Sequence, residues 1–253
     1  MRMNKLRGVM HVHTDLSHDG LHSPQELQQL FIRHNLQFAC LTDHSQDVRE
    51  EQFENLRKQC RDLSDPDFVL IPGIEYSCDG GVHIMGIGIS HITRATAHAE
   101  VINHIHTHNG LAVLAHPTKD RYPLSHDWLG LLDGVEIWNR AVDSKYLPQT
   151  VSIRTFFDLK KEHAHLTAFF GLDLHRERSY QDHAMEIEAD SCDLDRIVQA
   201  LKSGRHRCVS RFFQVSAHPE IGPGKLATVA FFRMALNSLR WVKELFQRAQ
   251  AKA

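Results

Sequence analysis

The sequence predicts an α/β fold in which strands and helices alternate to form a β/α barrel. Short apolar runs recur along the chain, and stretches with helical or polar patterns separate them, which is the rhythm of β/α units. Histidine and acidic side chains stand at the ends of these runs, as expected where strand ends open on one functional face. The length of 253 residues, with 42% hydrophobic residues, suits one barrel-sized domain or two small ones.

Seven apolar runs mark the predicted strands. They span residues 8–12, 38–42, 68–74, 82–89, 111–115, 134–138 and 166–172. The fourth run opens on His83, whereas the other polar residues of interest close or follow their runs. A hairpin at residues 78–81 would return His83 to the face on which the other strands end.

Four segments between and after these runs have the pattern of helices. Residues 23–26 read Ser-Pro-Gln-Glu, a capping box with proline at the first helical position, and apolar residues follow at helical spacing. This pattern predicts a helix over about 24–34. Three further segments with helical patterns cover 47–63, 95–108 and 193–202.

The C-terminal part of the chain has a different character. A Pro/Gly turn region begins at Ala217, and a long amphipathic run follows over about 225–249. We therefore expect a barrel domain over 1–216 and, over 217–253, the turn region and an appended C-terminal helix. The helix carries an apolar stripe and a mostly basic polar face. The sequence leaves three possible contacts for this stripe: its own barrel, a second copy in a homo-oligomer, and a membrane surface.

Composition limits the classes of partner. The 29 basic and 31 acidic residues nearly cancel, so no stable nucleic-acid partner is implied and any recognition of phosphate must be local. The five cysteines are never closer than 16 positions, which suggests neither a disulfide framework nor a CxxC site and favours reduced thiols in a cytoplasm. No signal peptide or membrane span is evident in the pattern, so we expect a cytoplasmic protein.

The polar residues at the run ends are expected to converge. In a strand, residues i and i+2 project to the same side, so His11 and His13 can face one volume, as can Asp173 and His175. The full candidate set is His11, His13, Asp19, His44, Glu75, His83, His116, Asp173 and His175. Each motif alone admits a structural explanation, such as a turn or a cap, but their joint placement favours a single cluster.

Metal ions would explain such a cluster. Six imidazoles and three carboxylates are too many polar groups to bury unpaired. Nitrogen and oxygen ligands without thiolate suit zinc, manganese or iron, and nine donors exceed the shell of one ion. We therefore expect two to three divalent ions. Three polar residues near the strand ends are not candidate ligands: Asp43, Glu136 and Asn139. We expect Asp43 to orient an imidazole. Glu136 and Asn139 are expected either to do the same or to close the barrel.

Seven motifs, in this order along residues 7–215, resemble the polymerase and histidinol phosphatase (PHP) family: HVHTDLSHDG, LTDH, GIEYS, VHIMGIG, AHP, GVEIWN and GLDLH. The resemblance implies a distorted (β/α)₇ TIM-like barrel and a trinuclear centre. It implies that His11, His13, Glu75 and Asp173 hold one ion, that Glu75 bridges to a second held by His83 and His116, and that Asp19, His44 and His175 hold the third. Three positions depart from the family pattern: Met10 precedes the first histidine, Arg176 replaces a glycine after DxH, and Lys119 to Arg121 follow the AHP motif.

The function expected from the residues and the resemblance is hydrolysis of a phosphoester by a metal-bridging hydroxide in a trinuclear site, with Glu75, Asp173 and His175 as catalytic residues. The substrate would be a small phosphomonoester, a nucleotide or a short nucleic-acid end. Four cations that follow strand ends are candidates for binding its phosphate: Arg176, Arg140, Lys119 and Arg121.

Two alternatives stay open. The same activated water can attack a carbonyl, which would make the protein a metal-dependent amide or lactone hydrolase. The other alternative is a non-catalytic, PHP-like metal-binding or interaction module. Cations at the rim of the site favour phosphate over a carbonyl substrate, and the intact set of ligand types argues against a site that has lost catalysis.

Overall fold

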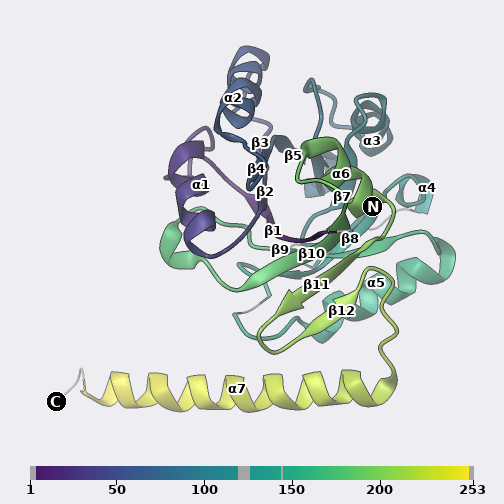
Figure 1. Cartoon of the computed structure of the whole chain (residues 1–253). Coiled ribbons are helices and arrows are strands. Elements are labelled where there is room, and N and C mark those ends of the chain that lie inside the picture. Colours follow the sequence, from purple (N-terminus) through teal and green to yellow (C-terminus); the bar gives the residue numbers. More distant parts are fainter. Residues whose placement is uncertain (1–3, 119–125, 144, 251–253) are drawn as a thin grey trace.

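The computed structural model describes residues 4–118, 126–143 and 145–250, and it contains two six-stranded sheets surrounded by helices (Figure 1). The strand order is β12-β11-β10-β1-β2-β4 in the first sheet and β3-β5-β6-β7-β8-β9 in the second. The α/β class is therefore confirmed, and each of the seven predicted apolar runs contains or overlaps a strand.

The first sheet combines a parallel half and an antiparallel half. Its parallel strands are β1 (Asn4–Val12), β2 (Phe38–Leu41) and β4 (Val69–Ile71). Its antiparallel strands are β10 (His183–Ala189), β11 (His206–Ser210) and β12 (Gln214–Ser216), and β10 pairs with β1. These three strands were not predicted from the sequence.

The second sheet is also mixed. Its strands are β3 (Asp43–His44), β5 (Gly73–Ser77), β6 (His83–Ile87), β7 (Leu111–Leu114), β8 (Gly134–Asn139) and β9 (Thr167–Gly171). The β5–β6 and β6–β7 pairs are antiparallel, and the remaining pairs are parallel. The 3₁₀ helix η1 (Asp79–Gly81), in which Gly80 and Gly81 have positive φ, joins β5 to β6. The expected hairpin is thus confirmed, and it sets His83 opposite Ser77.

The two sheets meet at the end of β1. The end of β1 is tied to the segment after β9 by a bridge between Val12 and Leu174 and by a bond from the Leu174 amide to the His11 carbonyl (3.1 Å). On the other side, the Thr42 amide donates to the Val12 carbonyl (2.7 Å). Two more bonds run beside the bridge, from the Leu172 amide to the Met10 carbonyl (3.0 Å) and from the His13 amide to the Leu174 carbonyl (2.9 Å). The end of β1 is available for them because its pairing with β10 stops at Gly8. The expected barrel is shown only as a mixed α/β arrangement.

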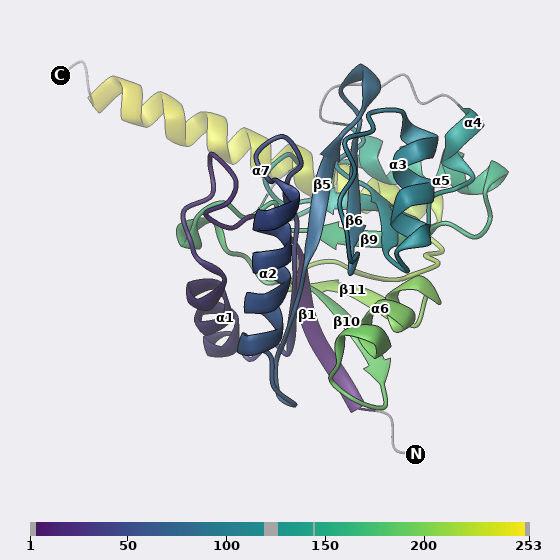
Figure 2. The same cartoon turned by 90° about the horizontal axis from the view of Figure 1, so that it is seen from above.

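The helices cover the outside of the sheets. They are α1 (Pro24–Arg33), α2 (Glu50–Leu63), α3 (His98–Thr107), α4 (His126–Leu129), α5 (Thr150–Glu162), α6 (Leu194–Lys202) and α7 (Pro223–Gln250), with the 3₁₀ helix η2 at Glu177–Ser179. Figure 2 shows α1 and α2 on one side of the strands and α3, α4 and α5 on the other. The capping box of α1 forms as predicted, with the Ser23 amide donating to Glu26 at 2.8 Å. Helices α4 and α5 were not predicted.

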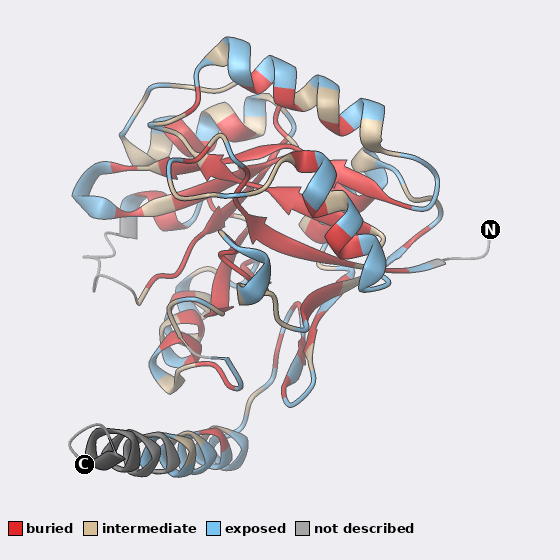
Figure 3. Ribbon diagram, turned by 90° about the vertical axis from the view of Figure 1, so that its left-hand side faces the viewer, coloured by how far each residue is buried: buried red, intermediate tan, exposed pale blue. Residues whose placement is uncertain are grey.

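The sheets form the buried centre of the molecule, and the helices expose their outer faces (Figure 3). The strands of the second sheet are buried over almost their whole length, which is why their sequences are continuous apolar runs. Polar residues are therefore conspicuous where they interrupt this interior, and most of them lie at one end of the sheets.

The long helix α7 leaves the body of the protein (Figure 1). Near its start Val229 is buried, and the Arg233 guanidinium donates to the Leu147 carbonyl at 2.8 Å. Phe231, Phe232 and Met234 are exposed. No helix among the described residues is both long and apolar enough to cross a membrane. The division into domains 1–216 and 217–253, and any partner of the helix, stay predictions.

Candidate metal centre

The structure brings all nine candidate ligands to one end of the two sheets. His11 lies in β1 and His13 directly follows it, His44 lies in β3, Glu75 lies in β5 and His83 begins β6. The others follow strands or occupy loops: Asp19 after β1, His116 after β7, and Asp173 and His175 after β9. The contacts described below join the nine side chains into one continuous cluster.

Glu75 lies at the centre of the cluster and is buried, with 1% exposure. Its Oε1 atom is 2.8 Å from His83 Nδ1 and 2.8 Å from His116 Nε2. Its Oε2 atom is 3.0 Å from His44 Nδ1. The imidazoles of His11 and His13 complete the surroundings, at 3.4 Å from Oε1 and 3.6 Å from Oε2 respectively. One carboxylate therefore contacts five imidazoles.

Asp173 forms the second carboxylate focus. Its Oδ1 atom is 3.3 Å from His13 Nε2, 3.5 Å from His11 Nε2 and 3.6 Å from His175 Nδ1. The backbone helps to fix this position, because the amide of His13 donates to the carbonyl of Leu174 at 2.9 Å. The same two histidines thus face both Glu75 and Asp173.

Asp19 lies at the rim, where its side chain is 42% exposed. Its Oδ2 atom is 3.1 Å from His175 Nε2, and its Oδ1 atom is 3.5 Å from His44 Nε2. The following residue, Gly20, allows the loop to fold back on itself, since a Cβ there would be 1.9 Å from the Thr14 carbonyl oxygen. The glycine therefore helps to return the Asp19 carboxylate to the cluster.

The charges in the cluster shift the pKa values of its members. Burial lowers the pKa of His11, but the carboxylates of Glu136, Asp173 and Glu75 raise it to well above its usual range. Burial raises the pKa of Glu75, but the surrounding histidines, His11 first, bring it well below its usual range. The pKa of Asp173 is likewise held below its usual range, against burial, chiefly by His11 and His13. The carboxylates thus stay ionised, and positive charge stabilises them.

The cluster also contains unmet hydrogen-bonding capacity. Among the described residues, five buried atoms here have no hydrogen-bond partner: the Nε2 atoms of His11, His13 and His175, Nδ1 of His44 and Oδ1 of Asp19. A buried polar atom left in this state costs about 1–3 kcal/mol. The distances of 3.0–3.6 Å to neighbouring carboxylate oxygens do not satisfy hydrogen-bond geometry at these atoms.

These distances fit a shared metal ion. Two ligand atoms that are each about 2.1 Å from one ion lie roughly 3.0–3.4 Å apart. Three groups bring their ligand atoms within 4.8 Å of one another: His11, His13 and Asp173; His11, Glu75 and His116; and His13, His44 and His175. The donor set, imidazole and carboxylate without thiolate, suits a divalent transition metal. The residues present therefore fit the metal ions that the sequence indicates.

A second layer of residues holds the histidines in place. Glu136 is buried, and its Oε1 atom lies 2.8 Å from His11 Nδ1, which turns His11 Nε2 toward the centre of the cluster. Its other oxygen accepts from the His116 amide (2.8 Å) and from Asn139 Nδ2 (3.1 Å). A Cβ at position 171 would lie 1.7 Å from Glu136 Oε1, so Gly171 makes room for this carboxylate.

Asp43 contacts the turn after β1. It accepts from the amide and hydroxyl of Thr14 (2.7 and 2.8 Å) and from the Ser17 hydroxyl (2.7 Å). Ser17 Oγ in turn lies 3.3 Å from His13 Nδ1. Asp43 therefore fixes the turn after β1 and reaches His13 through Ser17, and no hydrogen bond to the ring of the adjacent His44 is present in the described contacts.

Backbone conformation also distinguishes the cluster. Five non-glycine residues in the described ranges have positive φ, and two of them are asparagines outside the cluster. The other three are His11 (φ 61°), His116 (27°) and Asp173 (51°), all in the cluster. Such conformations persist where the surroundings enforce them, and they concentrate at functional sites.

The four candidate phosphate-binding cations differ in their surroundings. Arg140 is partly buried, and burial lowers its pKa against the opposing charge of Asp173. Its Nε atom has no hydrogen-bond partner among the described residues. Arg176 is exposed and makes no ion pair with the cluster in the described structure, and the neighbouring Glu177 pairs instead with Arg33 at 3.0 Å. Lys119 and Arg121 lie outside the described residues. The four phosphate contacts stay predictions.

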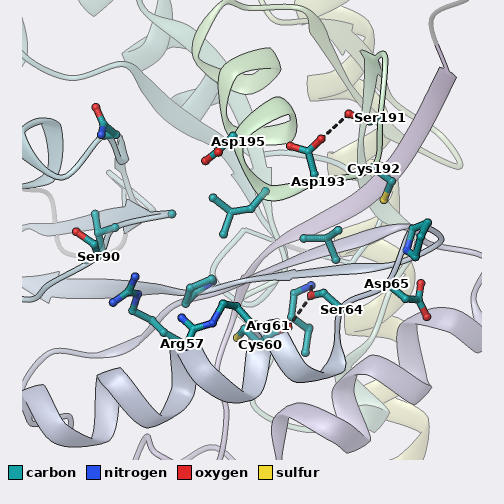
Figure 4. A pocket seen from close by; sticks show the side chains of 18 of the residues that line it. Arg57, Cys60, Arg61, Ser64, Asp65, Ser90, Ser191, Cys192, Asp193 and Asp195 are labelled. Atoms are coloured by element: carbon teal, nitrogen blue, oxygen red, sulfur yellow. Dashed lines mark hydrogen bonds between the residues drawn. The ribbon is translucent and has the colours of Figure 1, made fainter.

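A larger cavity lies at the opposite end of the sheets (Figure 4). Its volume is about 710 Å³, and Arg57 and Arg61 of α2 face the start of α6 across it. It is lined by Val69, which pairs with the first residue of β2, whereas the cluster gathers where the parallel strands end. None of the nine candidate ligands lines it.

Comparison with known proteins supports the fold. No protein-family model matches the sequence, and no curated protein is significantly similar to it. Among solved structures, a two-domain protein from Bacteroides vulgatus that contains a predicted PHP-like metal-dependent phosphoesterase matches with a TM-score of 0.64. The match has 20% identity and covers 85% of this chain and 67% of that one.

Two further structures are similar. PsfC from Pseudomonas syringae matches with a TM-score of 0.60 and 14% identity, over 92% of this chain and 100% of that one. The lesion-specific endonuclease PfuEndoQ from Pyrococcus furiosus matches with a TM-score of 0.55 and 14% identity, over 87% of this chain and 60% of that one. At these identities the comparisons show a shared fold. The chain therefore has the fold of PHP-like metal-dependent phosphoesterases, in agreement with the resemblance of its motifs.

Proposed function

We propose that this protein is a metal-dependent phosphoesterase. The observation that carries the proposal is the convergence of six imidazoles and three carboxylates in which five buried ligand atoms have no hydrogen-bond partner among the described residues. Several structures that share the fold are described as metal-dependent phosphoesterases or as an endonuclease, which supports the same chemistry. We further infer that the two sheets are an opened form of the distorted (β/α)₇ barrel that the motifs indicate.

The residues of the cluster would hold two to three divalent ions, zinc, manganese or iron. The three close-set groups share His11 and His13, so they are overlapping parts of one donor set rather than three separate sites. This set, to which His83 and Asp19 would add donors at the rim, supports the trinuclear centre that the motifs imply. When bound, divalent ions neutralise phosphate charge and lower the pKa of water so that it can attack at neutral pH. Glu75 and Asp173 would contribute the anionic charge that holds the ions.

The remaining residues position this machinery. Glu136 fixes His11, and Asp43 fixes His13 through Ser17, so the inner imidazoles hold one orientation. The inner histidines are fully buried, whereas Asp19 and His175 are exposed by 42% and 23%. The substrate would therefore enter over the Asp19 and His175 rim. Arg140, next to Asp173, would offer its guanidinium to the phosphate.

The proposed substrates are a phosphomonoester, a nucleotide or an oligonucleotide end. Arg140 and Arg176 make a matched pair for testing which cation recognises phosphate, because both follow a strand-end motif and only the first is partly buried beside the cluster. We expect Arg140→Ala to raise KM for a phosphomonoester about 10-fold or more, since charged hydrogen bonds contribute about 1.5–3 kcal/mol. If Arg176 also contacts phosphate, as the sequence predicts, Arg176→Ala will raise KM for monoesters more than for a diester.

Elemental analysis of protein purified without chelator, combined with a substrate panel, tests the proposal. The panel contains phosphomonoesters, phosphodiesters, short oligonucleotides, a lactone and an amide. We expect two to three transition-metal ions per chain and turnover of phosphoesters that is lost on metal removal and restored by metal. Full activity in metal-free protein would overturn the proposal. Turnover of the lactone or amide alone would assign the site to carbonyl chemistry, and bound metal without any turnover would favour a binding module.

A further inference from the structure

A smaller cavity opens beside the end of β8, the strand that carries Glu136. Its volume is about 330 Å³, and its lining includes Trp138 and His183, the pair Lys145 and Tyr146, and the pair Arg211 and Phe212. Trp138 follows Glu136 by two positions on β8, and His183 begins β10. The two residue pairs come from the segment after β8 and from the connection between β11 and β12.

Arg140 links this cavity to the cluster. It follows Trp138 by two positions, and its amide donates to the carbonyl of Gly171 at 2.9 Å, two positions before Asp173. Burial lowers the pKa of both Arg140 and His183; the charge of Asp173 opposes this shift at Arg140, and the charge of Arg140 adds to it at His183. A phosphate held near Arg140 would therefore lie between the cluster and the cavity.

The rim of the cavity carries two exposed aromatic rings, each with a cation. Tyr146 and Phe212 are 41% and 60% exposed, and their ring centroids are 6.1 Å apart in an edge-to-face arrangement. Lys145 Nζ lies 5.5 Å from the Tyr146 centroid, and the Arg211 guanidinium lies 5.3 Å from the Phe212 centroid. Exposed aromatic rings interleaved with cations are the pattern with which proteins stack unpaired bases and track their phosphates.

The floor of the cavity contains a polar group without a partner. His183 is 4% exposed and packs edge-to-face on Trp138 with ring centroids 4.0 Å apart. Neither of its ring nitrogens has a hydrogen-bond partner among the described residues. A neutral imidazole offers one donor and one acceptor, which complements the mixed donor and acceptor edge of a heterocyclic base.

We propose that this cavity binds the base of a nucleotide substrate while its phosphate reaches Arg140 and the cluster. The inference rests on the proposed phosphoesterase function and names its substrate class. A volume of about 330 Å³ is at the lower end of the range of roughly 300–1,000 Å³ for small-molecule sites, which suits one base rather than several. The nearly balanced charge of the whole chain also favours a mononucleotide or a short chain end over a long polyanion.

The experiment compares substrates that differ only in the base. The metal-loaded protein is assayed on the four common nucleoside 5′-monophosphates and on ribose 5-phosphate, and we expect a higher kcat/KM for at least one nucleotide. Phe212→Ala should lower that kcat/KM about 5- to 150-fold, the equivalent of about 1–3 kcal/mol per stacked base, and leave ribose 5-phosphate unchanged. Phe231→Ala removes a ring of similar exposure, 59%, on α7 and should change neither.

A binding measurement separates the two proposals. Calorimetric titration with the free nucleosides needs no turnover, and we expect binding to the wild-type protein that Phe212→Ala weakens by a similar factor. Hydrolysis of phosphomonoesters with no preference for any nucleotide, no effect of Phe212→Ala and no nucleoside binding would overturn the base site and leave the phosphoesterase proposal intact. Absence of any phosphoester hydrolysis, with nucleoside binding that depends on Phe212, would overturn the phosphoesterase proposal and retain the cavity as a nucleoside site.

Discussion

The two ends of the sheets differ in whether their polar side chains have hydrogen-bond partners or are exposed. The cavity at the start of the parallel strands has a volume of about 710 Å³, and none of its lining residues has a buried side-chain polar atom without a hydrogen-bond partner in the described structure. Asp193 there caps α6 by accepting from the Arg196 amide at 2.9 Å, and Arg61 is exposed. At the other end, buried imidazoles such as His11 and His13 have ring nitrogens without a hydrogen-bond partner in the part of the chain that the structure describes. Unmet hydrogen-bonding capacity, rather than cavity size, marks the end that is built for a ligand.

The strongest challenge to this comparison is removal of a central carboxylate. Asp173→Ala takes away an oxygen that lies within 3.6 Å of three imidazoles, and His175→Ala removes one of those rings. We expect either change to lower kcat/KM on a phosphomonoester about 1,000-fold or more, since metal-dependent charge stabilisation contributes several kcal/mol to the barrier. The circular dichroism spectrum should keep its native form.

The matched control lies at the opposite end. Asp195→Ala removes an exposed carboxylate from the first turn of α6, and turnover should not change. Equal activity of wild type and Asp173→Ala would show that the cluster is not where the reaction occurs.

Metal removal should produce the next largest effect, this time on stability. A ligand that binds only the folded state at about 1,000 times its Kd contributes about 4 kcal/mol. We therefore expect chelation followed by dialysis to lower the free energy of unfolding by about that amount in urea denaturation. The shift should be much smaller in Asp173→Ala, which has lost part of the site. Identical midpoints with and without metal would mean that the cluster is satisfied by protonation alone.

A buried histidine away from the cluster gives a smaller effect that depends on pH. His206 is 5% exposed, its Nε2–H donates to the Ala168 carbonyl at 2.9 Å, and burial lowers its pKa to about 4. Between pH 6.5 and about pH 4 the unfolded chain takes up a proton that the folded chain does not, so stability falls as pH falls, by about 1.4 kcal/mol per unit. Above pH 6.5 His206 is neutral in both the folded and the unfolded chain, so the stability lost at lower pH is fully present.

Urea denaturation at several pH values checks this expectation. His206→Gln removes the titrating ring, so its stability should depend on pH less steeply than that of the wild type, by one proton across the window. The same slope in both proteins would show that His206 is protonated in the folded state.

The smallest effects are expected at the larger cavity. Arg57→Ala and Arg61→Ala remove side chains that make no ion pair within the described part of the chain. Each should change the free energy of unfolding by less than about 0.5 kcal/mol and leave kcat/KM unaltered. Loss of turnover in either variant would show that the larger cavity affects the reaction at the cluster, and that the two ends of the sheets are not independent.

The sequence predicted strands wherever both faces are buried, because such strands are continuous apolar runs. It did not indicate β10 (His183–Ala189), whose alternating exposed residues reflect its place beside β1 and β11. Helix α5 was also missed, although Ile153, Phe156 and Leu159 are buried at helical spacing and provided a signal. Of the predicted barrel, the structure confirms the mixed α/β arrangement, and the pairing of β1 with β10 could not be predicted because it joins segments distant in sequence.

The candidate site was predicted more completely than the fold. Its nine members could be found because each interrupts or follows an apolar run, where a polar residue needs an explanation. The supporting contacts were less accessible. Glu136 orients His11 from 125 positions away, and Asp43 reaches His13 through Ser17 rather than acting on its neighbour His44. Such relations follow from side-chain geometry, which spacing alone does not contain.

The left-handed backbone at three cluster residues sets a limit on engineering this protein. His11, His116 and Asp173 adopt a region that costs an ordinary residue about 1–2 kcal/mol and glycine almost nothing. A selection that rewards only heat resistance in metal-free protein would therefore enrich glycine at these three positions. The variants that survive heating best would be those that have lost the site, so any stabilisation programme for this chain needs activity as a second criterion.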